Sequence, residues 1–188
     1  MDKTKQAELA VIGAGPGGYA AAFRASDLGK KVILIDRDPT LGGVCLNRGC
    51  IPSKALLHIS KVMEDASSLK KMGVSYNKPE IDLEKIRSHK NKIVSQLNQG
   101  IDRMAKARGV ETIQGLASFK SNNETVVKTK TSEINIEFEK CIIASGSRSG
   151  MISGLDSNNK SILTSRTALE LSDIPKKLIV IGGGAIGL

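Results

Sequence analysis

Residues 7–18 read Ala-Glu-Leu-Ala-Val-Ile-Gly-Ala-Gly-Pro-Gly-Gly and decide the fold. The mostly apolar stretch 7–12 predicts a buried strand, and a turn rich in glycine follows it directly. Residues 19–28 are rich in alanine and predict a helix, and the apolar residues 31–35 predict a second strand. Because a helical crossover joins the two strands, they should pair in parallel. The sequence therefore predicts an α/β fold with a Rossmann-like sheet.

The turn has the spacing Gly13-x-Gly15-x-x-Gly18 between this strand and this helix. Gly13 permits a tight turn, Gly15 lets the backbone approach a pyrophosphate, and Gly18 lets the helix pack against the strand. The start of the helix then presents N–H groups and a partial positive charge to the phosphates. Asp36 follows at the end of the second strand, where an acidic residue binds ribose hydroxyls. The pattern predicts a dinucleotide-binding domain, and its alternative is a glycine turn used only for packing.

Two long helices are expected downstream. A glycine- and cysteine-rich loop over 41–50 precedes a helix that begins near Pro52 and ends near Met72. A second helix is expected over 83–107, because its apolar residues recur at helical spacing.

The pattern changes after this helix. Residues 110–138 alternate β-branched and polar side chains and predict an antiparallel meander, with a turn at Asn122-Asn123. Residues 141–144 are apolar throughout and predict a central strand. A last strand is expected over 177–181, directly before a second glycine motif. A strand and a glycine turn at the very end lead us to expect a fragment of a longer protein.

Composition bounds the function. The net charge of +9 comes from Lys and Arg spread along the chain, without a localised basic patch, so we expect no nucleic-acid partner. No apolar run approaches the ~20 residues of a membrane span. The first residues lack a signal-peptide core and run straight into a strand, which favours the cytoplasm.

Two of the three cysteines, Cys45 and Cys50, lie close together in the sequence. A regular helix would hold them too far apart for a disulfide, but Gly49 and the helix start near Pro52 allow irregular backbone. Cysteines near a helix start have lowered pKa values, and Arg48 between them would add to this effect. The pair is therefore a candidate for thiol–disulfide exchange. A structural disulfide, a zinc half-site and two unrelated buried cysteines are the alternatives.

A metal site is not expected. Zinc requires about four ligands, and the remaining candidates, Cys141, His58 and His89, are scattered without partner spacing. Cys141 lies in an apolar strand and is predicted to serve packing.

Residues 42–57, Gly-Gly-Val-Cys-Leu-Asn-Arg-Gly-Cys-Ile-Pro-Ser-Lys-Ala-Leu-Leu, resemble the redox signature of the pyridine nucleotide–disulfide oxidoreductases. Among these, the stretch from Ile51 is most similar to the dihydrolipoyl dehydrogenases, whereas mercuric and glutathione reductases usually differ there. The resemblance covers the whole chain and ends at Gly182-x-Gly184-x-x-Gly187, which looks like the family's NAD fingerprint. It implies FAD and NAD as cofactors and the oxidation of protein-bound dihydrolipoamide to lipoamide with reduction of NAD⁺.

The resemblance also implies a role for each matching residue. Cys45 would exchange with the lipoyl disulfide, and Cys50 would lie against the flavin and pass electrons to it. Lys54 would lie near the flavin ring, where a cation stabilises the charge of a reduced flavin. The further residues implied at FAD are Gly13, Gly15, Gly18, Asp36, Arg37, Gly43, Val44, Cys45, Gly115, Ala117 and Gly146. Those implied at NAD are Gly182, Gly183, Gly184, Ala185 and Ile186.

The same resemblance implies domains and partners. Residues 1–150 would form the FAD-binding domain with the redox-active disulfide, 151–175 a connecting segment, and 176–188 the start of a truncated NAD-binding domain. The whole enzyme would be a homodimer that serves the lipoyl carrier domain and the E2 core of a 2-oxo acid dehydrogenase complex. A mercuric or glutathione reductase-like enzyme and a non-catalytic FAD-binding fragment are the alternatives.

Some positions depart from the family's pattern. Asp36 stands where Glu is commoner, Arg48 replaces a small apolar residue, and Ser149 stands where Pro is usual. The family's catalytic His-Glu dyad is missing, because Met63 and Val94 stand at the glutamate's distance after the two histidines. We therefore expect this chain alone to be inactive.

Overall fold

The computed structural model describes residues 3–150, 152–156 and 159–187. The chain divides into two compact units, which are described separately. The sheet unit contains Met1–Leu46 and Ser95–Ser147, and the helical unit contains Asn47–Val94 and Arg148–Leu188.

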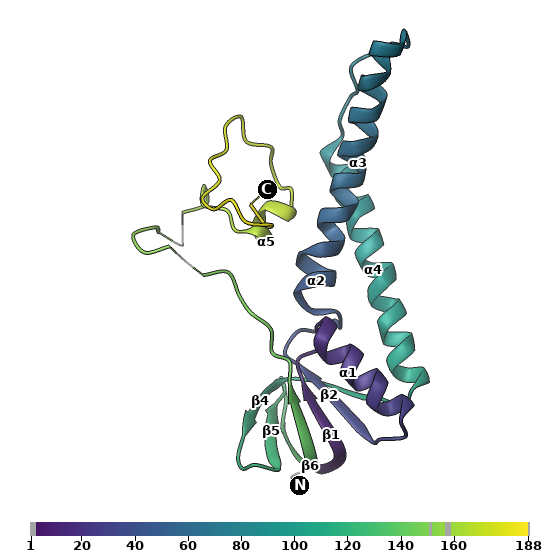
Figure 1. The fold of residues 1–188 in the computed structure, drawn as a ribbon. Coiled ribbons are helices and arrows are strands. Elements are labelled where there is room, and N and C mark those ends of the chain that lie inside the picture. Colours follow the sequence, from purple (N-terminus) through teal and green to yellow (C-terminus); the bar gives the residue numbers. More distant parts are fainter. Residues whose placement is uncertain (1–2, 151, 157–158, 188) are drawn as a thin grey trace. The chain divides into compact units, whose positions relative to one another are not determined.

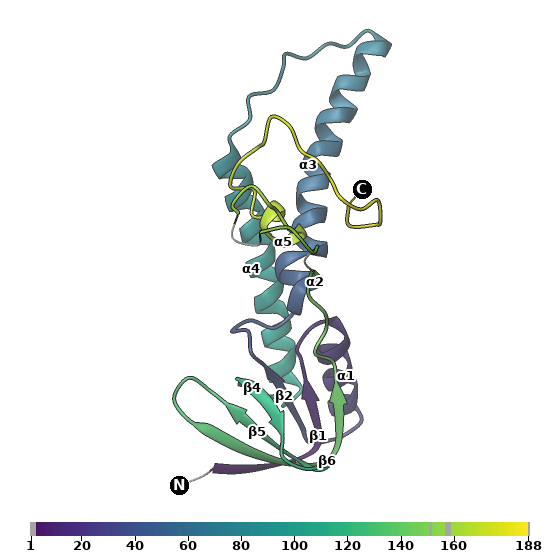
Figure 2. The ribbon, with the colours of Figure 1, turned by 90° about the vertical axis from the view of Figure 1, so that its left-hand side faces the viewer.

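A six-stranded sheet in the order β3-β2-β1-β6-β5-β4 forms the sheet unit (Figure 1). Its strands are β1 (Lys3–Ile12), β2 (Val32–Asp36), β3 (Glu111–Gln114), β4 (Leu116–Phe119), β5 (Glu124–Lys128) and β6 (Glu133–Ile143). β1 pairs in parallel with both β2 and β6, and β2 pairs in parallel with β3. β4 and β5 add two antiparallel strands beside β6 (Figure 2). The predicted parallel sheet is confirmed.

The sheet curls so that its two edge strands meet. β3 and β4 lie at opposite ends of the strand order, yet only Gly115 separates them in the sequence. A Cβ atom on Gly115 would lie 2.5 Å from Cγ1 of Val127 on β5, so the closure leaves no room for a side chain. The parallel half and the antiparallel half therefore face each other.

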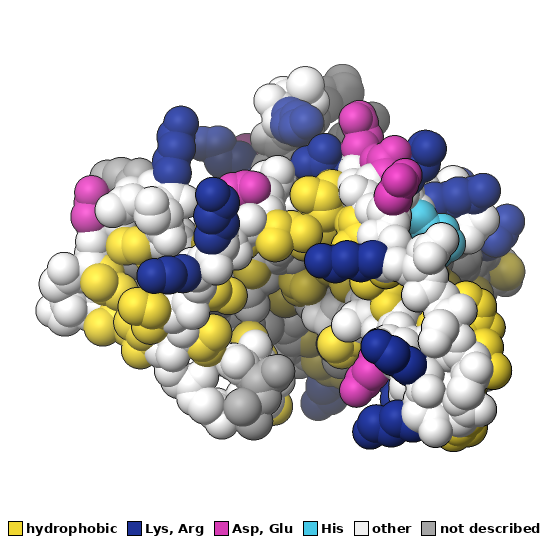
Figure 3. Space-filling model, turned by 90° about the horizontal axis from the view of Figure 1, so that it is seen from above, with side chains coloured by type: hydrophobic (Ala, Val, Ile, Leu, Met, Phe, Trp, Pro, Cys, Tyr) yellow, Lys and Arg dark blue, Asp and Glu magenta, His cyan; other side chains and the backbone are white. Residues whose placement is uncertain are grey.

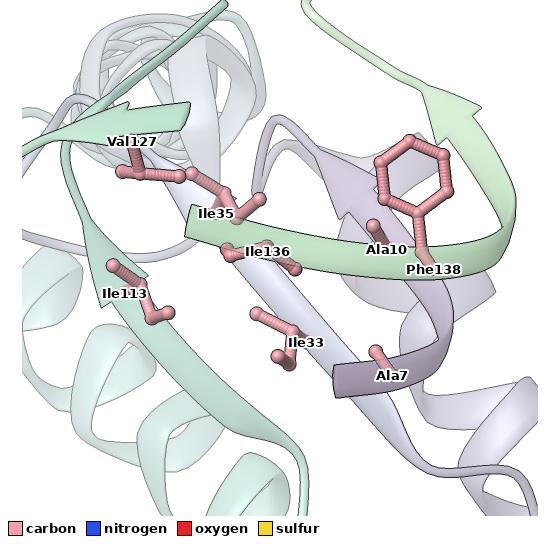
Figure 4. Close-up of a cluster of buried hydrophobic side chains, with 8 residues drawn as sticks. All are labelled: Ala7, Ala10, Ile33, Ile35, Ile113, Val127, Ile136 and Phe138. Carbon is pink, nitrogen blue, oxygen red and sulfur yellow. The ribbon is translucent and has the colours of Figure 1, made fainter. Parts of the chain in front are cut away.

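The core fills the space inside this curl (Figure 4). Ile33 and Ile35 come from the parallel half, and Val127 and Ile136 come from the antiparallel half. The whole cluster consists of Ala7, Ala10, Ile33, Ile35, Ile113, Val127, Ile136 and Phe138. Its aliphatic make-up agrees with a chain that has no Trp and 3% aromatic residues.

Helices α1 (Pro16–Asp27), α2 (Gly43–Arg48) and α4 (Leu83–Ala107) contribute to this unit. α1 packs on β1 and β2 (Figure 1). Arg108, directly after α4, connects the end of α4 to the end of α1. Its Nε donates to the Asp27 carboxylate at 3.0 Å, and its guanidinium lies 5.1 Å from the ring centroid of Phe23.

The helical unit contains α3 (Cys50–Ser68), a 3₁₀ turn (Leu69–Met72), the first part of α4 and the short helix α5 (Ser165–Leu169). Thr164 caps α5 through a reciprocal bond pair with Thr167. Lys90 of α4 is only 6% exposed, and its ammonium donates to the Leu169 carbonyl at 2.7 Å. Burial lowers the pKa of Lys90, because desolvation disfavours the charged ammonium group. The hydrogen bond to the Leu169 carbonyl at the end of α5 partly offsets this desolvation.

Three expectations were wrong in detail. The loop predicted over 41–50 contains α2, although the next helix, α3, begins at Cys50 and thus near Pro52 as predicted. β3 is part of the parallel sheet, so the meander begins only after Gly115. The described residues 159–187 contain no strand, although one was predicted over 177–181. A strand needs a neighbour for its N–H and C=O groups, and Ile179 is 88% exposed here.

The remaining elements agree with the sequence. The helix predicted over 83–107 has these bounds, and the turn at Asn122-Asn123 joins β4 to β5. Residues 141–143 of the strand predicted over 141–144 form the end of β6, which lies centrally between β1 and β5. Within the described ranges, no helix is both long and apolar enough to cross a membrane. On the face drawn in Figure 3, Lys and Arg side chains occupy several separate places among hydrophobic and acidic ones.

The closed core predicts a large effect of Ile136→Ala. Ile136 is 0% exposed, so the substitution should lower the free energy of unfolding by about 3 kcal/mol through lost burial and a cavity. Ile143→Ala is the control, because Ile143 lies on the same strand but is 67% exposed. Urea denaturation measures both, and equal effects would contradict the described core.

Candidate functional site

The glycine turn lies at the carboxyl end of β1, and each of its two tight contacts excludes a side chain. Gly13 has a φ of +103°, and a Cβ there would lie 2.2 Å from the carbonyl oxygen of Ala144. A Cβ on Gly18 would lie 1.7 Å from the carbonyl oxygen of Gly13. The turn is therefore compressed between the end of β6 and the start of α1.

The start of α1 is open toward a ligand. Its N-cap is Gly15, without a side-chain capping bond, Pro16 follows, and the first turn has no acidic residue. A Cβ on Gly17 would meet nothing within 4 Å. Because N–H groups at a helix start attract anions, this uncapped end fits a diphosphate.

Asp36 binds the turn itself. One carboxylate oxygen accepts from the backbone N–H of Ala14 at 2.6 Å, and the other accepts from that of Asp38 at 2.9 Å. The side chain thus connects the end of β2 to the glycine turn after β1. This bonding is a role of Asp36 that the sequence pattern did not suggest.

Several predicted residues meet at the same edge of the sheet. The N–H of Gly115 donates to the Asp36 carbonyl at 2.8 Å, and the N–H of Ala144 donates to the Ile12 carbonyl at 2.7 Å. Gly146 follows with a φ of +70°. Parallel sheets bind ligands beyond the carboxyl ends of their strands, and these residues lie there.

A small hollow of about 80 Å³ opens beside this edge. Asp36 lines it, together with Asp102 of α4. The other lining residues are Leu34, Asp38, Pro39, Leu41, Thr112, Ile113 and Gln114. Among the described residues, no cluster of His, Cys, Asp and Glu could hold a metal ion.

The loop that leads to Cys45 lies directly on the glycine turn. The N–H of Gly42 donates to the Ala14 carbonyl at 2.8 Å. Gly43 has a φ of +58°, and a Cβ there would lie 2.5 Å from the Cα atom of Gly15. The backbone of Gly43 therefore packs directly on the backbone of Gly15, and Cys45 follows in the first turn of α2. Val44 beside it is exposed.

Cys45 and Cys50 are both disulfide-bonded, whereas Cys141 is free. Since the chain has three cysteines, the first two are bonded to each other. Cys141 is half-buried in β6, and burial raises the pKa of its thiol. The predicted pair is confirmed, and Cys141 has the environment of a packing residue.

Other predicted residues belong to the helical unit. Lys54 is exposed on α3, as is His58. The motif Gly182–Gly187 follows the stretch in which no strand forms. His89 is exposed on α4. Arg37 and Ala117 lie in the sheet unit, after β2 and on β4 respectively.

Three features of the site occur together: a strand–turn–helix whose start can accept a phosphate, an acidic residue at the end of the next strand, and a disulfide close by in the chain. Together they define the dinucleotide-binding domain of a disulfide oxidoreductase. The chain belongs to the pyridine nucleotide-disulphide oxidoreductase family, whose model matches residues 7–188. The sheet and its helices have the fold of such a domain.

Known proteins agree with this assignment. The chain is 46% identical to a dihydrolipoyl dehydrogenase of Buchnera aphidicola subsp. Schizaphis graminum and 45% identical to one of Vibrio parahaemolyticus, in both cases over 100% of the chain and 40% of the relative. Its fold matches the HOCl-induced flavoprotein disulfide reductase RclA of Escherichia coli, solved as the Cu(II) complex of a cysteine-to-serine mutant. That match has a TM-score of 0.81, 25% identity, and covers 100% of this chain and 38% of the other. The chain thus spans about two fifths of the curated relatives it matches.

The compressed turn predicts opposite outcomes for two neighbouring glycines. Gly18→Ala would force a Cβ against the Gly13 carbonyl, and should lower the free energy of unfolding by about 3 kcal/mol. Gly17→Ala should cost little, because nothing lies within 4 Å of the new atom. Thermal and urea unfolding of both variants test this, and a destabilisation by Gly17→Ala as large as that by Gly18→Ala would refute the geometry.

Proposed function

We propose that this chain is the FAD-binding part, with the redox-active disulfide, of a dihydrolipoyl dehydrogenase. One observation carries the proposal: Gly43, the first residue of α2, lies against Gly15, so that Cys45 on the same helix follows directly after the contact with the glycine turn. A disulfide at that place serves electron transfer better than packing. The 46% identity to a dihydrolipoyl dehydrogenase favours this enzyme over other members of the family.

The residues at the sheet edge fit the cofactor. The diphosphate of FAD would rest on the uncapped start of α1, over Gly15 and Gly17. Asp36 and Arg37 would hold the adenylate ribose. For Asp36 to do so, one carboxylate oxygen must accept a ribose hydroxyl as well as a backbone N–H, which its two lone pairs permit. The further proposed contacts are Gly13, Gly18, Gly43, Val44, Cys45, Lys54, Gly115, Ala117 and Gly146.

The disulfide would act by exchange. A thiolate of dihydrolipoamide attacks Cys45, a mixed disulfide forms, and Cys50 leaves as a thiolate. The second thiol of the substrate then attacks the substrate sulfur that is bonded to Cys45. The bond between that sulfur and Cys45 breaks, lipoamide is released, and Cys45 and Cys50 remain as a dithiol. Two electrons and two protons have then passed from the substrate to the protein. When bound, FAD would accept this electron pair and pass it to a pyridine nucleotide.

The remaining assignments belong to the whole enzyme. We propose NAD⁺ as the final acceptor, with Gly182, Gly183, Gly184, Ala185 and Ile186 at the start of its site. Domain bounds of 1–150, 151–175 and 176–188 follow from this assignment. The partners would be the lipoyl carrier domain and E2 core of a 2-oxo acid dehydrogenase complex in the cytoplasm, and a second copy in a homodimer. This chain alone would not turn over, because it has no His-Glu base.

Flavin binding by this chain is the first test. The purified chain, mixed with FAD and freed of excess cofactor, should be yellow with a flavin spectrum. Gly18→Ala should weaken FAD binding about tenfold or more, because the start of α1 can no longer approach the diphosphate. Gly100→Ala is the control, because it adds the same methyl group on α4 with nothing within 4 Å, and it should bind FAD within about threefold of the parent chain. A colourless parent chain would contradict the proposed cofactor site.

Electron entry through the disulfide is the second test. In the full-length enzyme, Cys45→Ser and Cys50→Ser should each abolish flavin reduction by dihydrolipoamide, while the yellow colour remains. Cys141→Ser is the matched control and should leave the reduction rate unchanged. Stopped-flow absorbance measures the reduction. A parent flavin that dithionite bleaches but dihydrolipoamide does not would instead indicate a protein that only binds FAD.

A further inference from the structure

Asn98 is a buried polar residue for which the family pattern of the sequence assigns no role. It lies on α4, where apolar side chains recur on the covered face, and it is 9% exposed. Its amide nitrogen donates to the backbone carbonyl of Leu41 at 2.8 Å. Leu41 is itself buried, so this bond satisfies a carbonyl group that is shielded from water.

The bonded carbonyl belongs to the residue directly before the contact with the glycine turn. Gly42 donates to the Ala14 carbonyl, and Gly43 packs on Gly15. The segment Leu41–Gly43 is therefore held from two sides, by Asn98 of α4 and by the turn after β1. Cys45 follows on the same helix that Gly43 begins.

We propose that Asn98 is a positioning residue for the redox-active cysteine. Its amide fixes the Leu41 carbonyl, keeps Gly42 and Gly43 against the glycine turn, and thereby holds Cys45 in the place from which it pairs with Cys50. The inference rests on the proposed function, because it assigns Asn98 a part in the redox chemistry of that site. Asn98 does not touch the cysteines' sulfurs in this role and acts through the loop.

The physical reason is the free-energy cost of removing a buried hydrogen bond. The Leu41 carbonyl accepts from the Asn98 amide in a buried place, so removing this donor weakens the attachment of the segment to α4. The segment can then relax away from the turn more easily. The relaxation lowers the effective concentration of the Cys45 thiol toward Cys50, and the dithiol–disulfide equilibrium follows that concentration.

The test uses three variants of the full chain. Asn98→Leu and Asn98→Ala both remove the donor, and Asn98→Ala adds neither bulk nor charge in case the leucine variant does not fold. Gln99→Leu is the control, because it makes the same amide-to-leucine change at an exposed neighbour on α4. Native-state hydrogen exchange reports on the loop. We expect the Gly42 amide to exchange about tenfold faster without the Asn98 donor, while the Gly13 amide on β1's side of the turn stays unchanged.

The redox equilibrium of the cysteine pair gives the second measurement. Equilibration with dithiothreitol, followed by alkylation and mass spectrometry, yields the fraction of Cys45–Cys50 disulfide. We expect both Asn98 variants to shift this equilibrium toward the dithiol by about threefold or more, with Gln99→Leu like the parent. An equilibrium within twofold of the parent, or equal acceleration at Gly42 and Gly13, would show a merely structural residue and overturn the proposal.

This measurement needs neither FAD nor a lipoyl substrate. A parent enzyme that dihydrolipoamide fails to reduce would overturn the proposed function, yet would leave the shift between the parent and the Asn98 variants measurable. The two failures are therefore distinguishable.

Discussion

The close approach of two backbone segments, at Gly15 and Gly43, is the constraint on which the site depends. A Cβ at Gly43 would lie 2.5 Å from the Gly15 Cα atom, so neither segment can withdraw or gain bulk without moving the other. One segment starts helix α1, and the other leads to Cys45. The nucleotide-binding turn and the redox cysteine are thus coupled by glycine geometry rather than by a side-chain contact.

The curled sheet makes this approach possible. Gly115 joins the two edge strands and donates to the Asp36 carbonyl, so that the closure of the sheet also fixes the end of β2. Asp36 in turn accepts from the N–H of Ala14 in the glycine turn. Core and site are therefore joined through the ends of the strands, and the mostly aliphatic cluster packs inside the curl.

Polar groups from distant parts of the chain complete the arrangement. Asp36 and Asn98 each bond to backbone, the former at the glycine turn and the latter at the loop before Cys45. Such bonds restrict the backbone more than surface ion pairs do, because a buried polar group that loses its partner costs more than the bond itself contributes.

Local patterns in the sequence predicted the strand, glycine turn and helix at the start of the chain and the helix over 83–107, because each depends on spacing between near neighbours. They also made Cys45 and Cys50 a candidate pair, while the pairing itself was left open. Tertiary contacts decided the rest. β3 belongs to the parallel sheet because it pairs with β2. α2 begins where Gly42 and Gly43 contact the glycine turn. Residues 177–181 form no strand, because no strand in the described part of the chain pairs with them. The contact between Asn98 and Leu41 could not be predicted from the sequence. The two residues are far apart in the chain, and sequence spacing does not indicate which side-chain donor bonds to which backbone carbonyl.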